Sequence, residues 1–210
     1  MLLVTGVCGA LAVAWTAASD RAASSAPSGR AAPLPATPRP PAAESSAATI
    51  DLAPPAEKRA WSSIVVHHSA TSDGSVASID AVHRQQKDQQ GRPWLGIGYH
   101  FVIGNGRSMG DGEVQPTFRW RQQLAGAHAG TREYNDGGIG ICLIGNFDET
   151  PPSPKQLAAA RQLVARLAQQ CDIATVKVVR HQDVQATACP GRLFPWNEFL
   201  AGLPARDAAR

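Results

Sequence analysis

Three side chains in the sequence are good ligands for a zinc ion. His67 ends one apolar segment, His181 follows another, and Cys189 comes eight residues later in a loop that Pro190 and Gly191 stiffen. Two imidazoles and a thiolate suit Zn²⁺, and three protein ligands leave a fourth position open for water, which is the pattern of a catalytic site. Because His67 and His181 lie far apart in the sequence, spacing alone supports a metal site and a set of structural histidines equally.

His68 is an alternative to His67, because adjacent residues of a strand point to opposite faces and only one of them can reach the metal. The sequence alone leaves both open. The chain has four cysteines, which are too few for a disulfide framework in a chain of this length. Cys142 and Cys171 have apolar neighbours and are interpreted as core residues.

The candidate ligands must be positioned by strands and helices that the sequence marks. Four apolar runs predict strands, and they cover residues 62–69, 97–103, 139–144 and 176–179. The run at 139–144 is apolar on both faces, which predicts a central strand. A Gly-Asn-Gly sequence at 104–106 predicts a hairpin turn.

Three helices are predicted between and after these strands, at 79–90, after Ser153, and at 194–200. The second is the best marked, because Ser153 can cap it, Pro154 suits its first turn and Gln156 completes a capping box. Its apolar residues recur at helical spacing, at Leu157, Ala160, Leu163, Val164, Leu167 and Cys171.

Strands that alternate with helices around an apolar sheet predict the α/β class. We expect a single domain over residues 57–205, with a central mixed β-sheet flanked by helices. Ligands that come from strand ends and loops gather at one edge of such a sheet. The zinc is therefore expected at the edge of the sheet, in a surface groove.

The N-terminal segment has a different composition. Residues 1–18 are apolar and uncharged, and small residues follow them, so residues 1–19 are predicted to be a signal peptide or, since no basic residue precedes the run, a signal anchor. Residues 20–56 are rich in Ala, Pro and Ser and have too little apolar surface to offset the entropy of ordering, which predicts a disordered linker. We therefore expect an exported protein, periplasmic or associated with the cell envelope.

The formal net charge is +3, which is too small to indicate nucleic acid binding. Residues 1–56 carry equal numbers of acidic and basic side chains, so the positive excess belongs to the predicted domain. A slightly basic surface suits an anionic polymer such as a cell wall, although it would suit most other substrates as well.

Five sequence blocks occur in one order along the predicted domain. They are VVHHSAT, GIGYHFVI, AGAHAG, YNDGGIGICLIGNF and RHQDVQATACPG. This series resembles the zinc-dependent N-acetylmuramoyl-L-alanine amidases, a family that includes phage lysozyme-type amidases and the peptidoglycan recognition proteins. The resemblance runs from about Ile64 to Leu200 and so covers the whole globular part.

The resemblance implies a zinc cofactor and a role for each matching residue. His67, His181 and Cys189 match the three metal ligands. Tyr99 matches the tyrosine that hydrogen-bonds the zinc-bound water or the scissile carbonyl. Thr187 stands where relatives carry a lysine or a threonine, and either of these can donate a hydrogen bond to a developing oxyanion.

Three further histidines are interpreted separately. His128 is flanked by glycine and alanine and lines the cleft in this family, and exposed polar side chains of loops commonly bind ligands, so it is predicted to bind substrate. His100 follows Tyr99 on a strand, faces the opposite way and is interpreted as a core histidine or one that supports the site. His83 lies on a polar-faced helix and is interpreted as a surface residue.

The sequence departs from the family pattern in three places. Cys142 stands where one branch of the family has a catalytic glutamate, so that carboxylate is missing. Glu113 falls where relatives often have a Gly-Arg pair, and a groove arginine is either supplied by Arg119 or Arg121 or lost. Residues 85–92 look like an insertion.

The expected reaction is hydrolysis of the amide that joins N-acetylmuramic acid to L-alanine in peptidoglycan. The expected partner is peptidoglycan or muropeptides, and the chain is expected to be a monomer that its N-terminus could anchor to a membrane. A non-catalytic peptidoglycan-binding module of the same fold is the alternative, and it is typical where a ligand, usually the cysteine, is replaced. Two further alternatives are less favoured. A cytoplasmic relative that recycles wall fragments would not need the apolar N-terminus. A zinc peptidase would need a carboxylate base near the ligands, and none is evident there in the sequence.

Overall fold

The structure is a computed structural model that describes residues 59–88 and 90–207. The predicted signal peptide or signal anchor at 1–19 and the predicted linker at 20–56 lie outside the described residues, so both stay predictions. Within the described part of the chain, none of the helices has the length and the apolar character that crossing a membrane requires.

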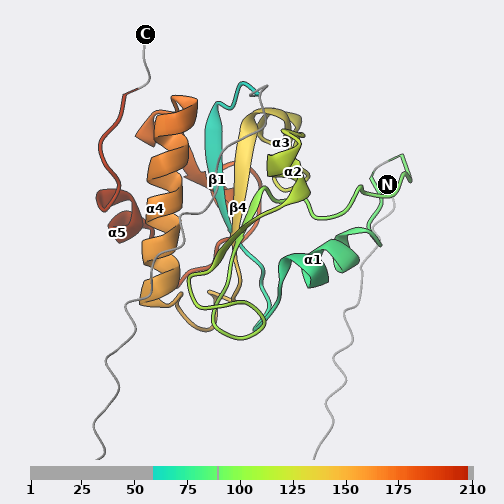
Figure 1. Ribbon diagram of the computed structural model, residues 1–210, viewed down its shortest axis with the longest axis horizontal. Coiled ribbons are helices and arrows are strands. Elements are labelled where there is room, and N and C mark those ends of the chain that lie inside the picture. The colour runs from blue at the N-terminus through green and yellow to red at the C-terminus, as the bar shows by residue number, and fades with distance from the viewer. Residues whose placement is uncertain (1–58, 89, 208–210) are drawn as a thin grey trace, which may run out of the picture. The chain divides into compact units, whose positions relative to one another are not determined.

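A five-stranded mixed sheet forms the centre of the fold, with the strand order β3-β2-β4-β1-β5. Its strands are β1 (Ser63–His68), β2 (Phe101–Ile103), β3 (Val114–Pro116), β4 (Gly138–Leu143) and β5 (Val178–Arg180). β1 runs parallel to β4 and β5, and β2 runs parallel to β4, whereas β3 pairs with β2 in the antiparallel direction. Together with the helices around this sheet (Figure 1), the pairing confirms the predicted α/β class and the mixed sheet.

β1 and β4 are buried along their whole length. β4 lies third among the five strands, which confirms the central position predicted from its apolar sequence. Alternate residues of a strand point to opposite faces, and Ile64, Val66 and Ile141 belong to the main hydrophobic cluster. His67 and Cys142 are register partners on these two strands. Because they alternate with the cluster residues, they lie on the opposite face, which carries the candidate chemistry.

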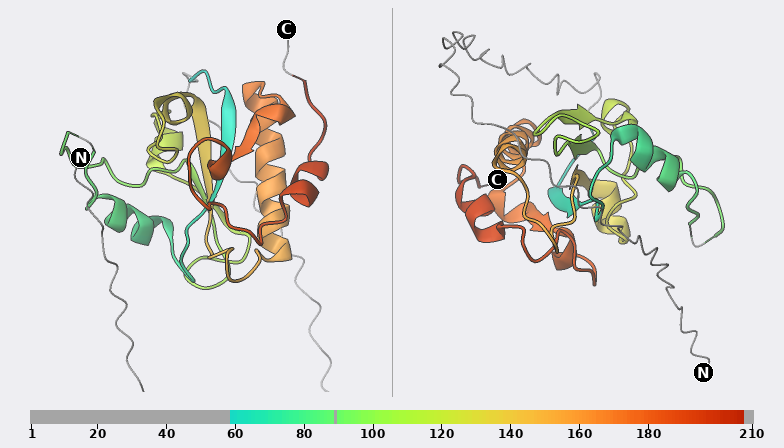
Figure 2. Two further views of the ribbon diagram at one scale, coloured as in Figure 1. Left: turned by 180° about the vertical axis from the view of Figure 1, so that it is seen from behind. Right: turned by 90° about the horizontal axis from the view of Figure 1, so that it is seen from below.

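The helix α4 (Pro154–Cys171) covers the core face of the sheet, with α5 (Trp196–Ala201) beside it (Figures 1 and 2). The predicted capping box is present, because Ser153 Oγ accepts from the Gln156 N–H at 3.0 Å and Gln156 Oε1 accepts from the Ser153 N–H at 3.2 Å. Gln156 Nε2 also donates to the Ile144 carbonyl at 2.8 Å, which ties the helix to the sheet. The predicted apolar stripe is buried at Ala160, Leu163, Val164 and Leu167, and it is partly buried at Leu157 and Cys171.

The helix α1 (Val76–His83) lies on the other side of the sheet (Figures 1 and 2). It begins before the predicted range of 79–90 because Ser75 and Ser78 cap each other's backbone N–H groups. It also ends earlier than predicted. Beyond its end, Asp88 Oδ1 accepts from the backbone N–H groups two and four residues further on, both at 2.9 Å, so this stretch is a loop.

The strand predicted at 97–103 is wrong in its first half, because side chains of α1 bond to that part of the backbone. Asp80 Oδ1 accepts from the Ile97 N–H at 2.8 Å, and His83 Nδ1 accepts from the Gly98 N–H at 2.9 Å. These bonds hold the segment against α1 instead of in the sheet, so β2 is short.

Several short elements have no clear sequence signal, and they are β3, α2 (Phe118–Arg121), α3 (Arg132–Gly137) and the 3₁₀ turns η1 (Thr175–Lys177) and η2 (His181–Asp183). The predicted hairpin exists between β2 and β3, but its connection runs over residues 104–113 instead of a tight turn. β5 and α5 begin two residues later than their predicted ranges.

Candidate metal centre and its cavity

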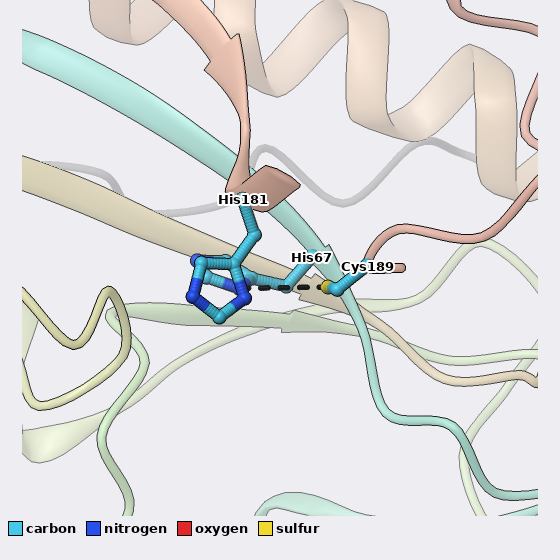
Figure 3. Close-up of side chains that lie close together, drawn as sticks. All are labelled: His67, His181 and Cys189. Carbon is cyan, nitrogen blue, oxygen red and sulfur yellow. Dashed lines mark hydrogen bonds between the residues drawn. The ribbon is translucent and has the colours of Figure 1, made fainter. Parts of the chain in front are cut away.

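The structure brings the three predicted ligands together. One ligand atom from each of His67, His181 and Cys189 lies within 4.8 Å of the others, and Figure 3 shows the two rings beside the cysteine sulfur. β1 and β5 are parallel neighbours, so their carboxyl ends meet at the same edge of the sheet. His67 lies near the end of β1 and His181 directly follows β5. The Gln182 N–H donates to the Cys189 carbonyl at 2.9 Å, which folds the following loop back onto this edge.

The chemistry and the spacing of these atoms fit a zinc ion. His67 Nδ1 lies 3.7 Å from Cys189 Sγ. Zinc binds sulfur at about 2.3 Å and nitrogen at about 2.0 Å, so a tetrahedral site separates two such ligand atoms by about 3.5 Å. Burial raises the pKa of the Cys189 thiol to about 12. The thiolate therefore requires a positive partner, which a zinc ion at this place would supply.

His68 does not reach the ligand group. Its Nδ1 accepts from the Phe147 N–H at 3.1 Å, and the centres of the two rings lie 5.8 Å apart. The two neighbouring histidines of β1 therefore point to opposite faces, as alternation predicts. The geometry places the imidazole of His67, and not that of His68, beside the Cys189 sulfur.

His67 is a buried imidazole without a carboxylate partner among the described residues. Burial and the neighbouring histidines lower its pKa well below the ordinary value, His128 most among those neighbours. The ring is therefore neutral near pH 7, and a neutral imidazole has one nitrogen lone pair to offer to a metal. Its Nε2 lies 3.1 Å from His128 Nδ1.

Tyr99 lies beside the ligand group, with its ring centre 5.1 Å from that of His67. Burial raises the pKa of its phenol well above the ordinary value, so the hydroxyl stays protonated and can donate a hydrogen bond. The nearby thiols of Cys142 and Cys189 also raise the pKa of the phenol. Cys142 is fully buried, as expected of a core residue, and it is the register partner of His67, so the two side chains lie on the same face of the sheet.

Thr187 is exposed on the loop before Cys189. Its hydroxyl oxygen accepts from the Cys189 N–H at 3.3 Å. Because this bond uses a lone pair of the oxygen, the hydroxyl hydrogen can still be donated to a ligand.

His128 is a buried residue and not the exposed loop side chain that the sequence suggests, because only 7% of its surface is accessible. It lines the cavity described below. Both ring nitrogens lie at hydrogen-bonding distance from protein atoms, Nδ1 from His67 Nε2 and Nε2 at 3.2 Å from the Gly138 carbonyl. Burial lowers the pKa of His128 to about 4, so its ring is neutral at pH 7.

The two remaining histidines near the site have different roles. His100 is fully buried, and its nitrogens bond the Gly140 N–H at 2.9 Å and the Leu124 carbonyl at 3.0 Å, which confirms a core position. The interpretation of His83 as a surface residue is wrong. It is half-buried, it lines the cavity, and its ring centre lies 5.6 Å from that of Tyr99.

A cavity of about 990 Å³ opens beside the ligand group. The predicted site residues His128, His181 and Tyr99 line it, together with residues that the sequence does not assign to the site: His83, Lys87, Asp88, Gln90, Arg92, Trp94, Arg132, Asn135, Asp136 and Gln185. The loop after α1 supplies one wall, which includes the predicted insertion at 85–92. Each cavity arginine pairs with an aspartate, at 2.7 Å for Arg92 and 3.2 Å for Arg132.

Neither arginine considered for the groove lies in it. Arg119 is buried at 5% exposure, and its guanidinium donates to the carbonyls of Ile97 and Ala125. Arg121 is exposed on α2 and does not line the described cavity. Arg119 instead joins the backbone before Tyr99 to the backbone before His128.

The fold and the site define an α/β domain with a potential His-His-Cys metal centre under a surface cavity. Known proteins are similar to this domain in sequence and in fold. The sequence family described as N-acetylmuramoyl-L-alanine amidase matches residues 57–192. The N-acetylmuramoyl-L-alanine amidase LysC from Clostridium intestinale has a similar structure, with a TM-score of 0.58 and 33% identity over 68% of this chain and 85% of that chain.

Two curated relatives belong to different branches. Peptidoglycan-recognition protein SC1a from Drosophila melanogaster is 33% identical over 141 residues, which are 64% of this chain and 70% of that protein. The endolysin of Escherichia phage T7 is 30% identical over 140 residues, which are 64% of this chain and 83% of that protein. The chain therefore belongs to the N-acetylmuramoyl-L-alanine amidase family.

Proposed function

We propose that this protein is a zinc-dependent amidase that cleaves the bond between N-acetylmuramic acid and L-alanine in peptidoglycan. The observation that carries the proposal is the complete ligand group of His67, His181 and Cys189, which lies within 4.8 Å at the edge of a large cavity. Membership of the amidase family supports the bond that is cut.

A zinc ion bound by these residues would polarise the scissile carbonyl and lower the pKa of the attacking water. The chain adds hydrogen-bond donors around the reacting group. We assign to the protonated Tyr99 hydroxyl and the Thr187 hydroxyl the role of stabilising negative charge that develops on the carbonyl oxygen. His83 Nδ1 is occupied by the Gly98 N–H, so the other nitrogen of the neutral ring carries the proton and can donate to a substrate in the cavity.

The walls of the cavity suit a glycopeptide with free carboxylates. Lys87, Arg92 and Arg132 contribute positive charge, and Trp94 offers an aromatic surface. The ion pairs of Arg92 and Arg132 are exposed to solvent. Exposed pairs of this kind contribute little stability, so either arginine can exchange its aspartate for a substrate carboxylate at small cost.

A non-catalytic binding module is the competing function, since several relatives are named peptidoglycan-recognition proteins. Such a module does not need a complete ligand group. The presence of all three ligands, with Cys189 buried against His67, favours the enzyme.

The test is to incubate the full chain with defined muropeptides, with and without a chelator, and to weigh the products. We expect release of the stem peptide that stops when zinc is chelated and returns when zinc is added. Binding of the muropeptide without any release, even with added zinc, would establish the binding module instead.

We also propose that the protein is exported to the periplasm or the cell envelope, on the basis of the uncharged apolar segment at residues 1–18. A fusion of residues 1–56 to a reporter that is active only outside the cytoplasm tests this. An inactive reporter in cells that produce the fusion would contradict export.

A further inference from the structure

We propose that His128 is a positioning residue that fixes the tautomer and the orientation of the metal ligand His67. This inference rests on the proposed zinc site. It goes beyond the cavity-lining position of His128, because it assigns the residue a function in the metal centre before any substrate arrives.

The first step is the bond between His128 and the backbone of β4. His128 Nε2 lies 3.2 Å from the Gly138 carbonyl oxygen. A carbonyl can only accept a hydrogen bond, so Nε2 must carry the proton. A neutral imidazole has one donor and one acceptor. The other nitrogen of His128, Nδ1, is therefore an acceptor.

The second step carries this restriction to His67. His67 Nε2 lies 3.1 Å from His128 Nδ1. Because His128 Nδ1 accepts, His67 Nε2 must donate, and the lone pair of His67 is left on Nδ1. Nδ1 is also the nitrogen that lies 3.7 Å from Cys189 Sγ. If His128 instead carried its proton on Nδ1 and donated to His67, two acceptors would face each other at 3.2 Å, namely His128 Nε2 and the Gly138 oxygen.

The His128 ring is held in a fixed orientation, which this assignment of donor and acceptor nitrogens requires. An added Cβ at Gly126 or Gly140 would lie 2.3 Å or 2.5 Å from His128 Cδ2, so the ring fills a slot that only glycine leaves open on both sides. Asn135 Oδ1 accepts from the backbone N–H groups of His128 and Ala129 at 2.8 and 2.9 Å. The loop that carries the ring is therefore anchored to α3.

A partner that holds the second nitrogen of a histidine ligand orients the ring and raises its basicity, and loss of such a partner typically lowers metal affinity by about 10- to 100-fold. We expect that range for His128→Leu, which removes both ring nitrogens. His128→Asn keeps an acceptor near the position of Nδ1 and is expected to retain most of the affinity. Lys87→Ala, on another wall of the same cavity, is the matched control and is expected to leave the affinity unchanged.

Zinc affinity is measured on the full chain without substrate, by competition with a chelator of known affinity. A fall for His128→Leu with recovery in His128→Asn supports the inference. Equal zinc affinity in the wild type and His128→Leu overturns it and leaves the proposed zinc enzyme intact. Failure of the wild type to bind zinc would overturn the proposed function, and this inference with it.

A second measurement needs no variant and so does not depend on the folding of His128→Leu. Nitrogen-15 NMR of the metal-free wild type at pH 7 reports which nitrogen of each ring is protonated. We expect His67 and His128 both to be protonated at Nε2. A proton on Nδ1 of His67 would contradict the inference.

Discussion

At the scale of single residues, burial decides which groups can act. The Cys189 sulfur is buried and accepts from the His68 N–H at 3.3 Å. It is the only one of the three proposed ligands that can bring a negative charge to the centre. His67 is neutral because burial lowers its pKa. At the proposed site, the thiolate would supply the negative charge that a divalent cation favours, and the two imidazoles would complete the set of protein ligands.

Cys189→Ser tests this charge. A serine hydroxyl stays protonated near neutral pH and is a poor zinc ligand, so we expect low zinc content and no hydrolysis. The cavity walls are unchanged, so binding to insoluble peptidoglycan should persist. Metal analysis, product release and sedimentation with wall material check the three expectations. Cys171→Ser on α4 is the control and should keep its zinc, whereas full zinc and full activity in Cys189→Ser would show that the metal site is assigned wrongly.

Tyr99→Phe separates chemistry from metal binding. The change removes a hydroxyl and leaves a ring that still packs beside His67. Loss of one donor to a developing oxyanion typically costs about 10²- to 10³-fold in turnover, and we expect a loss of that size with unchanged zinc content. Turnover on a muropeptide and zinc content are measured on the same preparation. Wild-type turnover would remove Tyr99 from the mechanism.

At the scale of elements, the site is held by side chains that bond to the backbone of neighbouring segments. Asp80 and His83 on α1 fix the segment before Tyr99, and Arg119 on α2 joins that segment to the loop before His128. Asn135 on α3 holds the His128 loop itself. Short helices with little core of their own therefore position the cavity walls.

Asn135→Ala tests this support. It leaves the N–H groups of His128 and Ala129 without their acceptor, and an unsatisfied buried donor costs about 1–3 kcal/mol. We expect a loss of that order in the free energy of unfolding, measured in urea. Asn135→Asp keeps an acceptor at the same place and is the matched control. Equal destabilisation by both changes would show that the oxygen of Asn135 does not support the loop.

The elements that the sequence predicts well are those whose signal is local. The capping residues Ser153 and Gln156 mark the start of α4, and the apolar run at 139–144 marks β4. The loop at 84–100 is mispredicted because its structure depends on bonds from Asp80 and His83, which no periodicity reports. The Pro-containing β3 is too short to leave a pattern.

The residues of the candidate site, like the elements, were predictable where their signal is local in the sequence. The ligands His67, His181 and Cys189 could be named because they lie in sequence blocks with a family pattern. The cavity residue His83 could not, because its role depends on contact with Gly98 and Tyr99. Asn135 lies within one of the quoted blocks, but only the fold shows that its side chain holds the loop of His128.

At the scale of the whole molecule, the two faces of the sheet differ in what they carry. The main hydrophobic cluster packs between the sheet and α4, and it reaches from Trp61 to Phe199. The opposite face carries the ligand group and the cavity, with α1 along its border (Figure 2). The site face also contains a smaller hydrophobic cluster of Ile97, Val102, Met109 and Ile144, and Tyr99 packs against it. Most of the large buried side chains lie on the α4 side, so a change at the ligand group can alter zinc binding without emptying the main core.

Deletion of residues 1–56 tests whether the domain needs anything outside the described residues. The described core begins at Trp61, the family match begins at residue 57, and residues 20–56 have few large apolar side chains to contribute. We expect a folded domain with unchanged zinc content and unchanged turnover on soluble muropeptides. Its melting temperature should stay within about 2 °C of that of the full chain. A change of about 1 kcal/mol in the free energy of unfolding shifts the melting temperature of a domain of this size by about 2–4 °C, so a smaller shift means that the segment adds little stability. A fall of many degrees would show that the N-terminal segment packs on the domain.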